Sequence, residues 1–561
     1  MGNGVTSSAS LLLPVPMWLD TNGSPLAAWR YQPVAPTRSR KVLIVPSIAY
    51  EDRVAESGCV ALAQQLAAAG FEVLTFDHYA TDQSPGSLTD EGIVNRWIRD
   101  IASALDTLGT NDVDIVTFRL GALLTLQATR GRTVRSLVLL SPTTSGKRFV
   151  RELRAMQASG ATRDTSSNHV VAGGYAFPED VLRDLAQLDV SHDATARVTR
   201  TLVYDSPARP VSASVLGILG AATKRSTADD IDSWIDVSAD QSEMPHHTIH
   251  CVVADLTDAT DADAAIGSGA AGGSRPQEPD ARSSPGWHDG SRTISQNNRL
   301  IVEDRCRIGA VGLAAVFTRP SGHHQTDSAV LFLSTTGPGD SFGHAAKEYA
   351  VAGIASLRVD FAGFRESGLW PGQPPGPSFY QPYGQRDLEI AVRHLRELGY
   401  QSVVVVGICS AAWAMVIAGP IVGIRSLVAV NPQFYVSSTG AISWFLKKNS
   451  GTRSRHERAL RTAGWAAAIV RAHISHYSLL RIRQLILAGV SVHLVFADDD
   501  TGLTFWRLAL ERRSARLRRR GLHVDIYPGL GHNLDNPVAR ADLLQFIHNE
   551  ATRPEQPMAR S

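Results

Sequence analysis

The chain has 561 residues, too many for one hydrophobic core, so we expect two or more domains. Hydrophobic residues make up 43% of it and charged residues 19%, values typical of soluble globular proteins. The net charge of +1 gives no global field that would favour nucleic acid or a membrane surface as a partner. Arginine greatly outnumbers lysine, which is typical of GC-rich bacterial genes.

The four cysteines lie far apart in the sequence and form no C-x-x-C pair, so we expect neither structural zinc nor a disulfide framework. They are Cys59, Cys251, Cys306 and Cys409. No apolar run is long enough to span a membrane, and the N-terminus lacks the charged and apolar regions of a signal peptide. The sequence therefore predicts a cytoplasmic protein without a membrane span or a metal.

The two halves of the chain repeat one plan. Each half opens with an apolar strand (residues 41–47 and 329–334), followed by an alanine-rich helix and a second strand. The intervals from glycine to aspartate and from aspartate to serine are seven residues in both halves, at Gly70, Asp77 and Ser84 and at Gly353, Asp360 and Ser367. Strands that alternate with helices predict two tandem α/β domains, each a mostly parallel central sheet flanked by helices.

Composition marks the boundaries between these domains. Residues 257–292 are rich in Gly, Ser, Ala, Asp and Pro and lack apolar periodicity, so we interpret them as a flexible linker. The first domain then covers residues 10–256 and the second covers residues 293–552. Each contains a helical insertion, at about 147–199 and about 437–489, that is either a cap over a strand-end pocket or extra helices packed on the sheet.

In the second half, the stretch VVVVGICSAA predicts a buried strand that turns sharply into a helix. A nucleophile elbow needs small residues two positions before and two after the nucleophile. Around Cys409 these positions hold Gly407 and Ala411. Around Ser410 the first of them is Ile408, which would clash. We therefore expect Cys409 at the apex, with Ser410 as the alternative nucleophile.

An acid and a base follow at the places that this mechanism requires. In the hydrolase order, the acid follows the penultimate strand and the histidine follows the last one. Asp500 is the chosen acid, with Asp498 and Asp499 as alternatives, and His532 lies in a glycine-flanked loop after the last strand. A paired imidazole favours the reactive thiolate of Cys409. The competing interpretation is a structural turn with a buried, inert cysteine.

An oxyanion hole would complete the site. The backbone N–H of Ser410 is the first expected donor, because it follows the apex. The second is expected after the strand at 329–333, at Thr335 or Thr336.

The first half lacks this chemistry. Its apex is Arg119, which cannot act as a nucleophile. Asp205 lies where an acid would be, while His246 and His247 are only loosely placed. We interpret this site as degenerate, with Arg119 either paired to Asp205 or holding a carboxylate or phosphate.

These features resemble known families. The chain resembles the α/β-hydrolase superfamily twice, which implies two tandem α/β-hydrolase-like domains. Its G-x-C-x-A elbow is similar to those of dienelactone hydrolases and polyhydroxyalkanoate synthases. Residues 119–124 (RLGALL) and 145–154 (SGKRFVRELR) resemble the type 2 hydrolases associated with the exosortase system. The Gly-x-Cys elbow and Asn431-Pro432 resemble the companion type 1 hydrolases. The usual Asn-Ala-Gly after the third strand reads Ser-Thr-Thr here, at residues 334–336.

The resemblance implies an ester or thioester hydrolase or an acyltransferase, linked to exopolysaccharide or related biosynthesis. The expected partner is a small-molecule or carrier-bound acyl substrate, and the two domains are expected to contact each other. No phosphate-binding glycine motif follows a strand, so no cofactor is expected. The arginine-rich segment 507–520 is expected to be a solvated helix face or, alternatively, a site for an anionic carrier. The alternative to an enzyme is a non-catalytic scaffold with two hydrolase-like domains.

Overall fold

A computed structural model shows two nine-stranded sheets, one in each half of the chain. The structure describes residues 13–21, 24–34, 38–159, 169–173, 175–190, 197–220, 223–237, 242–267, 287–322, 326–334, 339–373, 380, 383–434, 477–532, 534 and 536–554. None of the helices in these ranges has the length and apolarity that crossing a bilayer requires.

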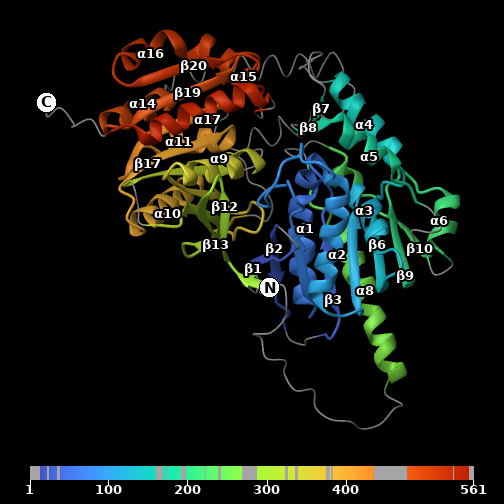
Figure 1. Cartoon of the computed structure of the whole chain (residues 1–561). Coiled ribbons are helices and arrows are strands. Elements are labelled where there is room, and N and C mark those ends of the chain that lie inside the picture. The colour runs from blue at the N-terminus through green and yellow to red at the C-terminus, as the bar shows by residue number, and fades with distance from the viewer. Residues whose placement is uncertain are drawn as a thin grey trace, which may run out of the picture.

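The first sheet and its helices occupy the N-terminal half (Figure 1). Its strands, together with the separate hairpin β7–β8, are β1 (Val15–Leu19), β2 (Leu26–Tyr31), β3 (Lys41–Val45), β4 (Glu72–Phe76), β5 (Val113–Phe118), β6 (Thr133–Leu140), β7 (His169–Ala172), β8 (Tyr175–Pro178), β9 (Arg197–Asp205), β10 (Thr223–Thr227) and β11 (Trp287–Asp289). Its helices are α1 (Tyr50–Ala68), α2 (Ile93–Leu108), α3 (Leu120–Ala128), α4 (Gly146–Ser159), α5 (Glu179–Gln187), α6 (Ala213–Leu219), α7 (Ile231–Ile235) and α8 (His246–Gly267).

The second sheet and its helices form the C-terminal half. The strands are β12 (Ser291–Gln296), β13 (Arg299–Ile308), β14 (Leu313–Pro320), β15 (Ser328–Ser334), β16 (Ala355–Asp360), β17 (Ser402–Ile408), β18 (Ile424–Val430), β19 (Ser491–Ala497) and β20 (Leu522–Tyr527). The helices are α9 (Gly339–Val351), α10 (Tyr383–Glu397), α11 (Ser410–Ala418), α14 (Tyr477–Leu487), α15 (Thr501–Phe505), the π-helix η2 (Trp506–Leu510), α16 (Glu511–Arg518) and α17 (Pro537–Thr552).

Both sheets have the same strand order. The first runs β10-β9-β6-β5-β3-β4-β2-β1-β11, and the second runs β12-β13-β14-β16-β15-β17-β18-β19-β20. The edge strands β11 and β12 and the separate hairpin β7–β8 are left out of the comparison. When the remaining eight strands of each half are numbered along the chain, both sheets have the spatial order 1-2-4-3-5-6-7-8. The third to eighth strands of each half pair in parallel. The first two strands pair antiparallel with each other, and the second also pairs antiparallel with the fourth. This arrangement is the α/β-hydrolase fold, present twice.

The repeated sequence spacing corresponds to a repeated hydrogen-bond pattern. Ser84 Oγ donates to the carbonyl oxygen of Asp77 at 2.7 Å and accepts an N–H of β2 at 2.9 Å. Ser367 Oγ donates to the carbonyl oxygen of Asp360 and accepts an N–H of β14, both at 2.8 Å. In each half, the serine ties the loop after one strand to a neighbouring antiparallel strand.

Apolar side chains fill both faces of each sheet. In the first half, one core lies under α2 to α5 and the other under α1, α7 and α8. In the second half, α10, α11 and α14 to α16 cover one face, while α9 and α17 cover the other. Each half is therefore a three-layer unit, and β17 is buried along its whole length between helices.

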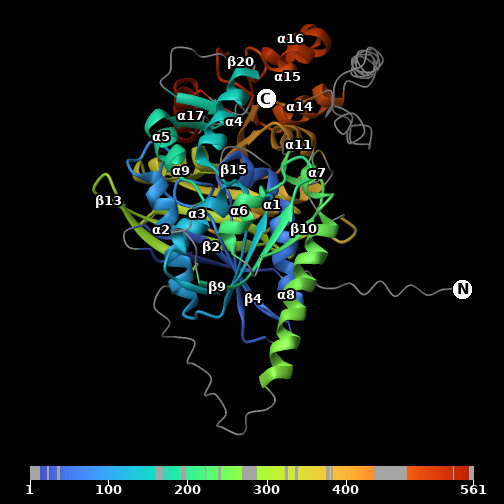
Figure 2. The same ribbon diagram turned by 90° about the vertical axis from the view of Figure 1, so that its right-hand side faces the viewer.

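The segment expected to be a linker has more structure than predicted. Helix α8 continues to Gly267 (Figure 2), and Trp287–Asp289 forms β11, which pairs with β1 of the first sheet. The alanines between 259 and 265 explain the helical extension, because alanine has the highest helix propensity. Residues 268–286 lie outside the described residues.

The two insertions are described to different extents. The first contains α4, the hairpin β7–β8 and α5. Of the second, α14 is described, whereas residues 435–476 lie outside the described residues. The arginine-rich segment forms η2 and α16.

Charged residues join the two halves. Arg365 of the second half forms ion pairs with Asp82 at 2.5 Å and with Glu56 at 2.7 Å, both in the first half. Arg305 Nη1 donates to carbonyl oxygens of β1 and β2, each at 2.6 Å, and its guanidinium lies 4.3 Å from the ring centre of Trp29. These contacts tie the first strands of the two sheets together.

Candidate active site

The turn after β17 has the strained backbone of a nucleophile elbow. Cys409 has φ 53° and ψ −110°, a region that non-glycine residues rarely adopt. A Cβ added to Gly407 would lie 2.5 Å from Met415 Sδ and 3.1 Å from the backbone carbon of Ala411. Position 407 therefore requires glycine, and Cys409 lies at the apex of the turn.

Cys409, Asp500 and His532 lie together at the carboxyl ends of the strands. His532 Nδ1 lies 2.5 Å from Asp500 Oδ2, and the imidazole also hydrogen-bonds to the thiol of Cys409. Burial favours the neutral imidazole, but the charge of Cys409 and the hydrogen bonds to Asp500 and Cys409 outweigh it. The pKa of His532 is therefore raised well above its ordinary value. The side chain of His532 is 40% exposed, so a substrate can reach it.

The structure distinguishes between the three candidate acids. Asp500 is buried and caps α15, accepting hydrogen bonds from Gly502 N at 2.6 Å and Gln433 Nε2 at 3.2 Å. Asp498 accepts instead from Gly529 N at 2.9 Å, and Asp499 is exposed. Asp500 is thus the one of the three that contacts the histidine.

Asn431 links the acid loop to the histidine loop. It is fully buried, and its side-chain amide donates to the carbonyl oxygens of Gly531 at 3.2 Å and His532 at 2.9 Å. Its side-chain oxygen accepts from Ala497 N at 2.8 Å. The sequence marks Asn431 only as a point of resemblance, because the partners of its side chain lie 66 residues or more away along the chain.

Tyr380 also reaches the nucleophile and was not predicted from the sequence. Its hydroxyl lies 3.3 Å from Cys409 Sγ, and its ring packs edge-on against Trp413 at 5.6 Å between ring centres. The tyrosine follows a stretch rich in Pro and Gly without any periodicity, QPPGPSF, so no local sequence signal marked it.

The expected oxyanion donors are described in part. Ser410 begins α11 and directly follows the apex residue Cys409. Its side chain is buried, whereas that of Cys409 is half-buried. Thr335 and Thr336 lie outside the described residues.

The corresponding site of the first half is filled by the chain itself. Arg119 Nε donates to Glu51 Oε1 at 2.9 Å, and Nη2 donates to Glu152 Oε2 at 3.2 Å. The second oxygen of Glu51 accepts from Leu120 N at 3.1 Å and from Ser47 Oγ at 2.6 Å. Leu120 is the residue after the apex, so the Glu51 carboxylate takes the place that a substrate oxyanion would occupy.

The expected pairing of Arg119 with Asp205 is wrong. Asp205 instead forms an ion pair with Arg225 on the adjacent strand β10 at 2.6 Å. Arg119 forms its ion pairs with Glu51 of α1 and Glu152 of α4. His246 and His247 begin α8, a helix that packs on α1.

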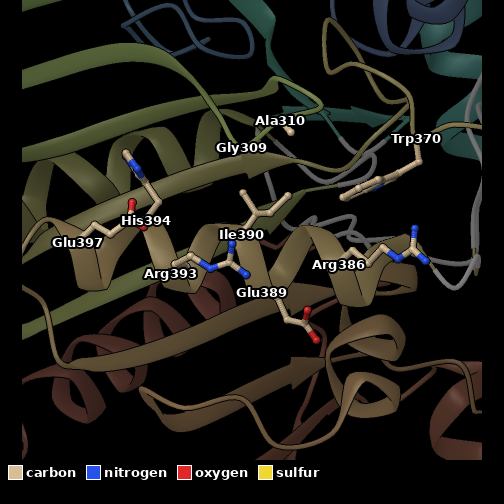
Figure 3. A pocket seen from close by; sticks show the side chains of 9 residues that line it. All are labelled: Gly309, Ala310, Trp370, Arg386, Glu389, Ile390, Arg393, His394 and Glu397. Carbon is tan, nitrogen blue, oxygen red and sulfur yellow. The ribbon is translucent and has the colours of Figure 1, made fainter.

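A surface cavity of about 430 Å³ lies along α10 (Figure 3). Nine residues line it: Gly309, Ala310, Trp370, Arg386, Glu389, Ile390, Arg393, His394 and Glu397. The guanidinium of Arg386 lies 5.2 Å from the ring centre of Trp370. This cavity includes none of the residues gathered at Cys409.

No family model matches the sequence. Among solved structures, the chain is similar to the ferulic acid complex of Est1E from Butyrivibrio proteoclasticus, with 17% identity over 44% of this chain and 99% of the other (TM-score 0.34). It is also similar to XC6422 from Xanthomonas campestris, an α/β serine hydrolase without a lid, with 12% identity over 46% and 97% (TM-score 0.28). A thermostable esterase from Pseudomonas putida matches with 13% identity over 47% and 83% (TM-score 0.28).

Proposed function

We propose that this protein cleaves a carboxylic ester or thioester through a covalent acyl intermediate on Cys409. The observation that carries the proposal is the contact of the Cys409 thiol with His532, which in turn contacts the buried Asp500. A nucleophile, a base and an orienting acid in this order are the elements of a catalytic triad.

The chemistry follows from the protonation of these groups. His532 takes the thiol proton as the general base, and the carboxylate of Asp500 beside its Nδ1 stabilises the imidazolium that forms. The thiolate attacks the acyl carbon, and the carbonyl electrons move to the oxygen, which accepts the Ser410 N–H. When the carbon–oxygen or carbon–sulfur bond to the leaving group breaks, His532 returns the proton to that group. Asp500 keeps the imidazole oriented throughout.

The acyl group then passes to water or to an acceptor hydroxyl, so the protein is an esterase, a thioesterase or an acyltransferase. A second oxyanion donor from Thr335 or Thr336 belongs to this proposal as well. The resemblance to the exosortase-associated hydrolases supports a place in exopolysaccharide or related biosynthesis. The first half acts as a non-catalytic partner. The Glu51 carboxylate, which accepts the Leu120 N–H at the corresponding position, supports this role.

A substrate screen tests the proposal. Wild type, Cys409→Ala and Cys409→Ser are assayed with p-nitrophenyl esters of increasing acyl length and with acyl-coenzyme A thioesters. Cys251→Ala serves as the matched control, because Cys251 lies on α8 of the first half. We expect turnover in wild type and the control and its loss in Cys409→Ala. Equal turnover by Cys409→Ala and wild type would contradict the proposal.

A further inference from the structure

We infer that Tyr380 is a catalytic residue of this site, whose hydroxyl donates a hydrogen bond to the acyl oxygen when Cys409 attacks; this inference rests on the proposed function. Tyr380 touches the reacting sulfur directly, since its hydroxyl oxygen lies 3.3 Å from Sγ. This distance is within hydrogen-bonding range for a sulfur atom, which is larger than oxygen.

The position of the hydroxyl suits the intermediate. After attack, the acyl carbon is bonded to Sγ and the acyl oxygen is bonded to that carbon, so the oxygen is two bonds from the sulfur. A donor that already contacts the sulfur can therefore reach this oxygen by a small rotation. Preorganised donors aimed at developing negative charge supply much of the rate enhancement in acyl transfer. No proton leaves the tyrosine, which only donates its O–H.

The ring is held at the nucleophile by the elbow helix. Trp413 lies one turn after the apex, where its backbone N–H donates to the Cys409 carbonyl oxygen at 3.0 Å. The planes of the Tyr380 and Trp413 rings meet at 81°, a favourable edge-to-face contact. Tyr380 also has a positive φ of 61°, and such strain in a non-glycine residue is concentrated at functional sites.

The hydroxyl complements the Ser410 amide. That amide comes from the helix that follows the apex, whereas Tyr380 comes from the segment between β16 and α10. Two donors from different elements can hold one oxyanion from two directions. In the first half the corresponding amide of Leu120 is bound to Glu51, so a donor of this kind would have no oxyanion to bind there.

The test compares two reactions of the same sulfur. Acetylation by p-nitrophenyl acetate passes through a tetrahedral oxyanion, whereas alkylation by iodoacetamide displaces iodide and forms none. Both are followed on Cys409 by mass spectrometry under single-turnover conditions, at a pH where the thiol is ionised. The variants are Tyr380→Phe and, as a matched control, Tyr477→Phe, whose hydroxyl accepts hydrogen bonds from Arg481 on α14.

We expect Tyr380→Phe to slow acetylation by about 100-fold, the effect of removing one oxyanion donor. Its alkylation should stay within about threefold of wild type, which also shows that the variant is folded with Cys409 accessible. Tyr477→Phe should match wild type in both reactions.

Two results would overturn the inference. Unchanged acetylation would show that the hydroxyl takes no part, and equal slowing of both reactions would show that Tyr380 acts only on the thiol. If wild type is acetylated elsewhere than at Cys409, the proposed function itself is wrong and the role of Tyr380 is lost with it.

Discussion

Arg119 and Cys409 occupy the same point in the two halves of the chain, each at the apex between a buried strand and a buried helix. Their backbone angles agree closely, with φ 49° and ψ −128° for Arg119 and φ 53° and ψ −110° for Cys409. Such a conformation costs about 1–3 kcal/mol for a non-glycine residue. The fold thus keeps its elbow in both halves, while only the second half places a nucleophile there.

The first half should be dispensable for chemistry but needed for stability. Replacing Arg119→Met leaves Glu51 as a buried carboxylate without its cation, so we expect a loss of about 3–5 kcal/mol in the free energy of unfolding. Turnover at Cys409 should stay within about twofold under native conditions. Urea denaturation and an ester assay measure these quantities. The double variant with Glu51→Gln should recover part of the stability, and loss of turnover in folded Arg119→Met would contradict the assignment.

His532 should make stability depend on pH. Its pKa is raised in the folded state, so the charged imidazole stabilises the fold fully below its ordinary pKa of about 6.5. This contribution is lost as the pH rises through the raised pKa. The difference in unfolding free energy between wild type and His532→Gln should therefore shrink as the pH increases from 6 upward.

His523 provides a control with the opposite sign. Burial and the neighbouring His493 lower the pKa of His523. His523→Gln should therefore gain stability relative to wild type as the pH falls below about 6.5. A difference for His532→Gln that is the same at every pH would contradict the raised pKa.

Gly502 should be required for the position of the acid. A Cβ at this residue would lie 2.7 Å from Asp500 Oδ1 and 2.7 Å from the carbonyl oxygen of Pro432. Gly502→Ala must displace one of them, and we expect turnover to fall by about 100-fold. Gly217→Ala is the control, because nothing lies within 4 Å of its added Cβ and it is in helix α6. Equal turnover in the two variants would show that Asp500 tolerates the displacement.

Glu366 of the second half lines a small pocket together with Glu56 and Asp77 of the first half. The interface between the halves should weaken as this carboxyl group ionises. Burial and the charge of Asp77 raise the pKa of Glu366 from 4.5 to about 7. The folded state therefore holds an extra proton between these two values, and wild type loses stability as the pH rises through that window. Glu366→Gln cannot ionise at this position. Its free energy of unfolding relative to wild type should therefore increase from pH 4.5 to 7 and stay constant above pH 7. Chemical denaturation across this range measures the gain; a gain independent of pH would contradict the shift.

The sequence predicted those features whose signals are local or periodic. The spacing from Asp77 to Ser84 and from Asp360 to Ser367 predicted a duplicated fold, because each pair closes a short loop on its own sheet. The small residue at Gly407 predicted the apex, since the steric requirement involves only neighbours along the chain.

Contacts between distant parts of the chain could not be predicted where no motif or strand order marks the residues. Asn431 binds loops 66 or more residues away, and Glu51 reaches Arg119 across 68 residues. Tyr380 lies in a segment with no pattern at all. The predicted pairing of Arg119 with Asp205 is wrong for the same reason. The acids that Arg119 contacts lie on helices α1 and α4, and the sequence does not show that these helices approach it. Alanine-rich residues of the expected linker instead extend α8.

The central claim is that the sulfur of Cys409 carries the acyl group. Wild type is mixed with p-nitrophenyl acetate, quenched with acid within the first turnover, digested and mapped by mass spectrometry. We predict one acetyl group on Cys409 in wild type and strongly reduced acetylation there in His532→Ala. An acetyl group on Ser410, or Cys409 labelled no faster than Cys59, Cys251 and Cys306, would contradict the account.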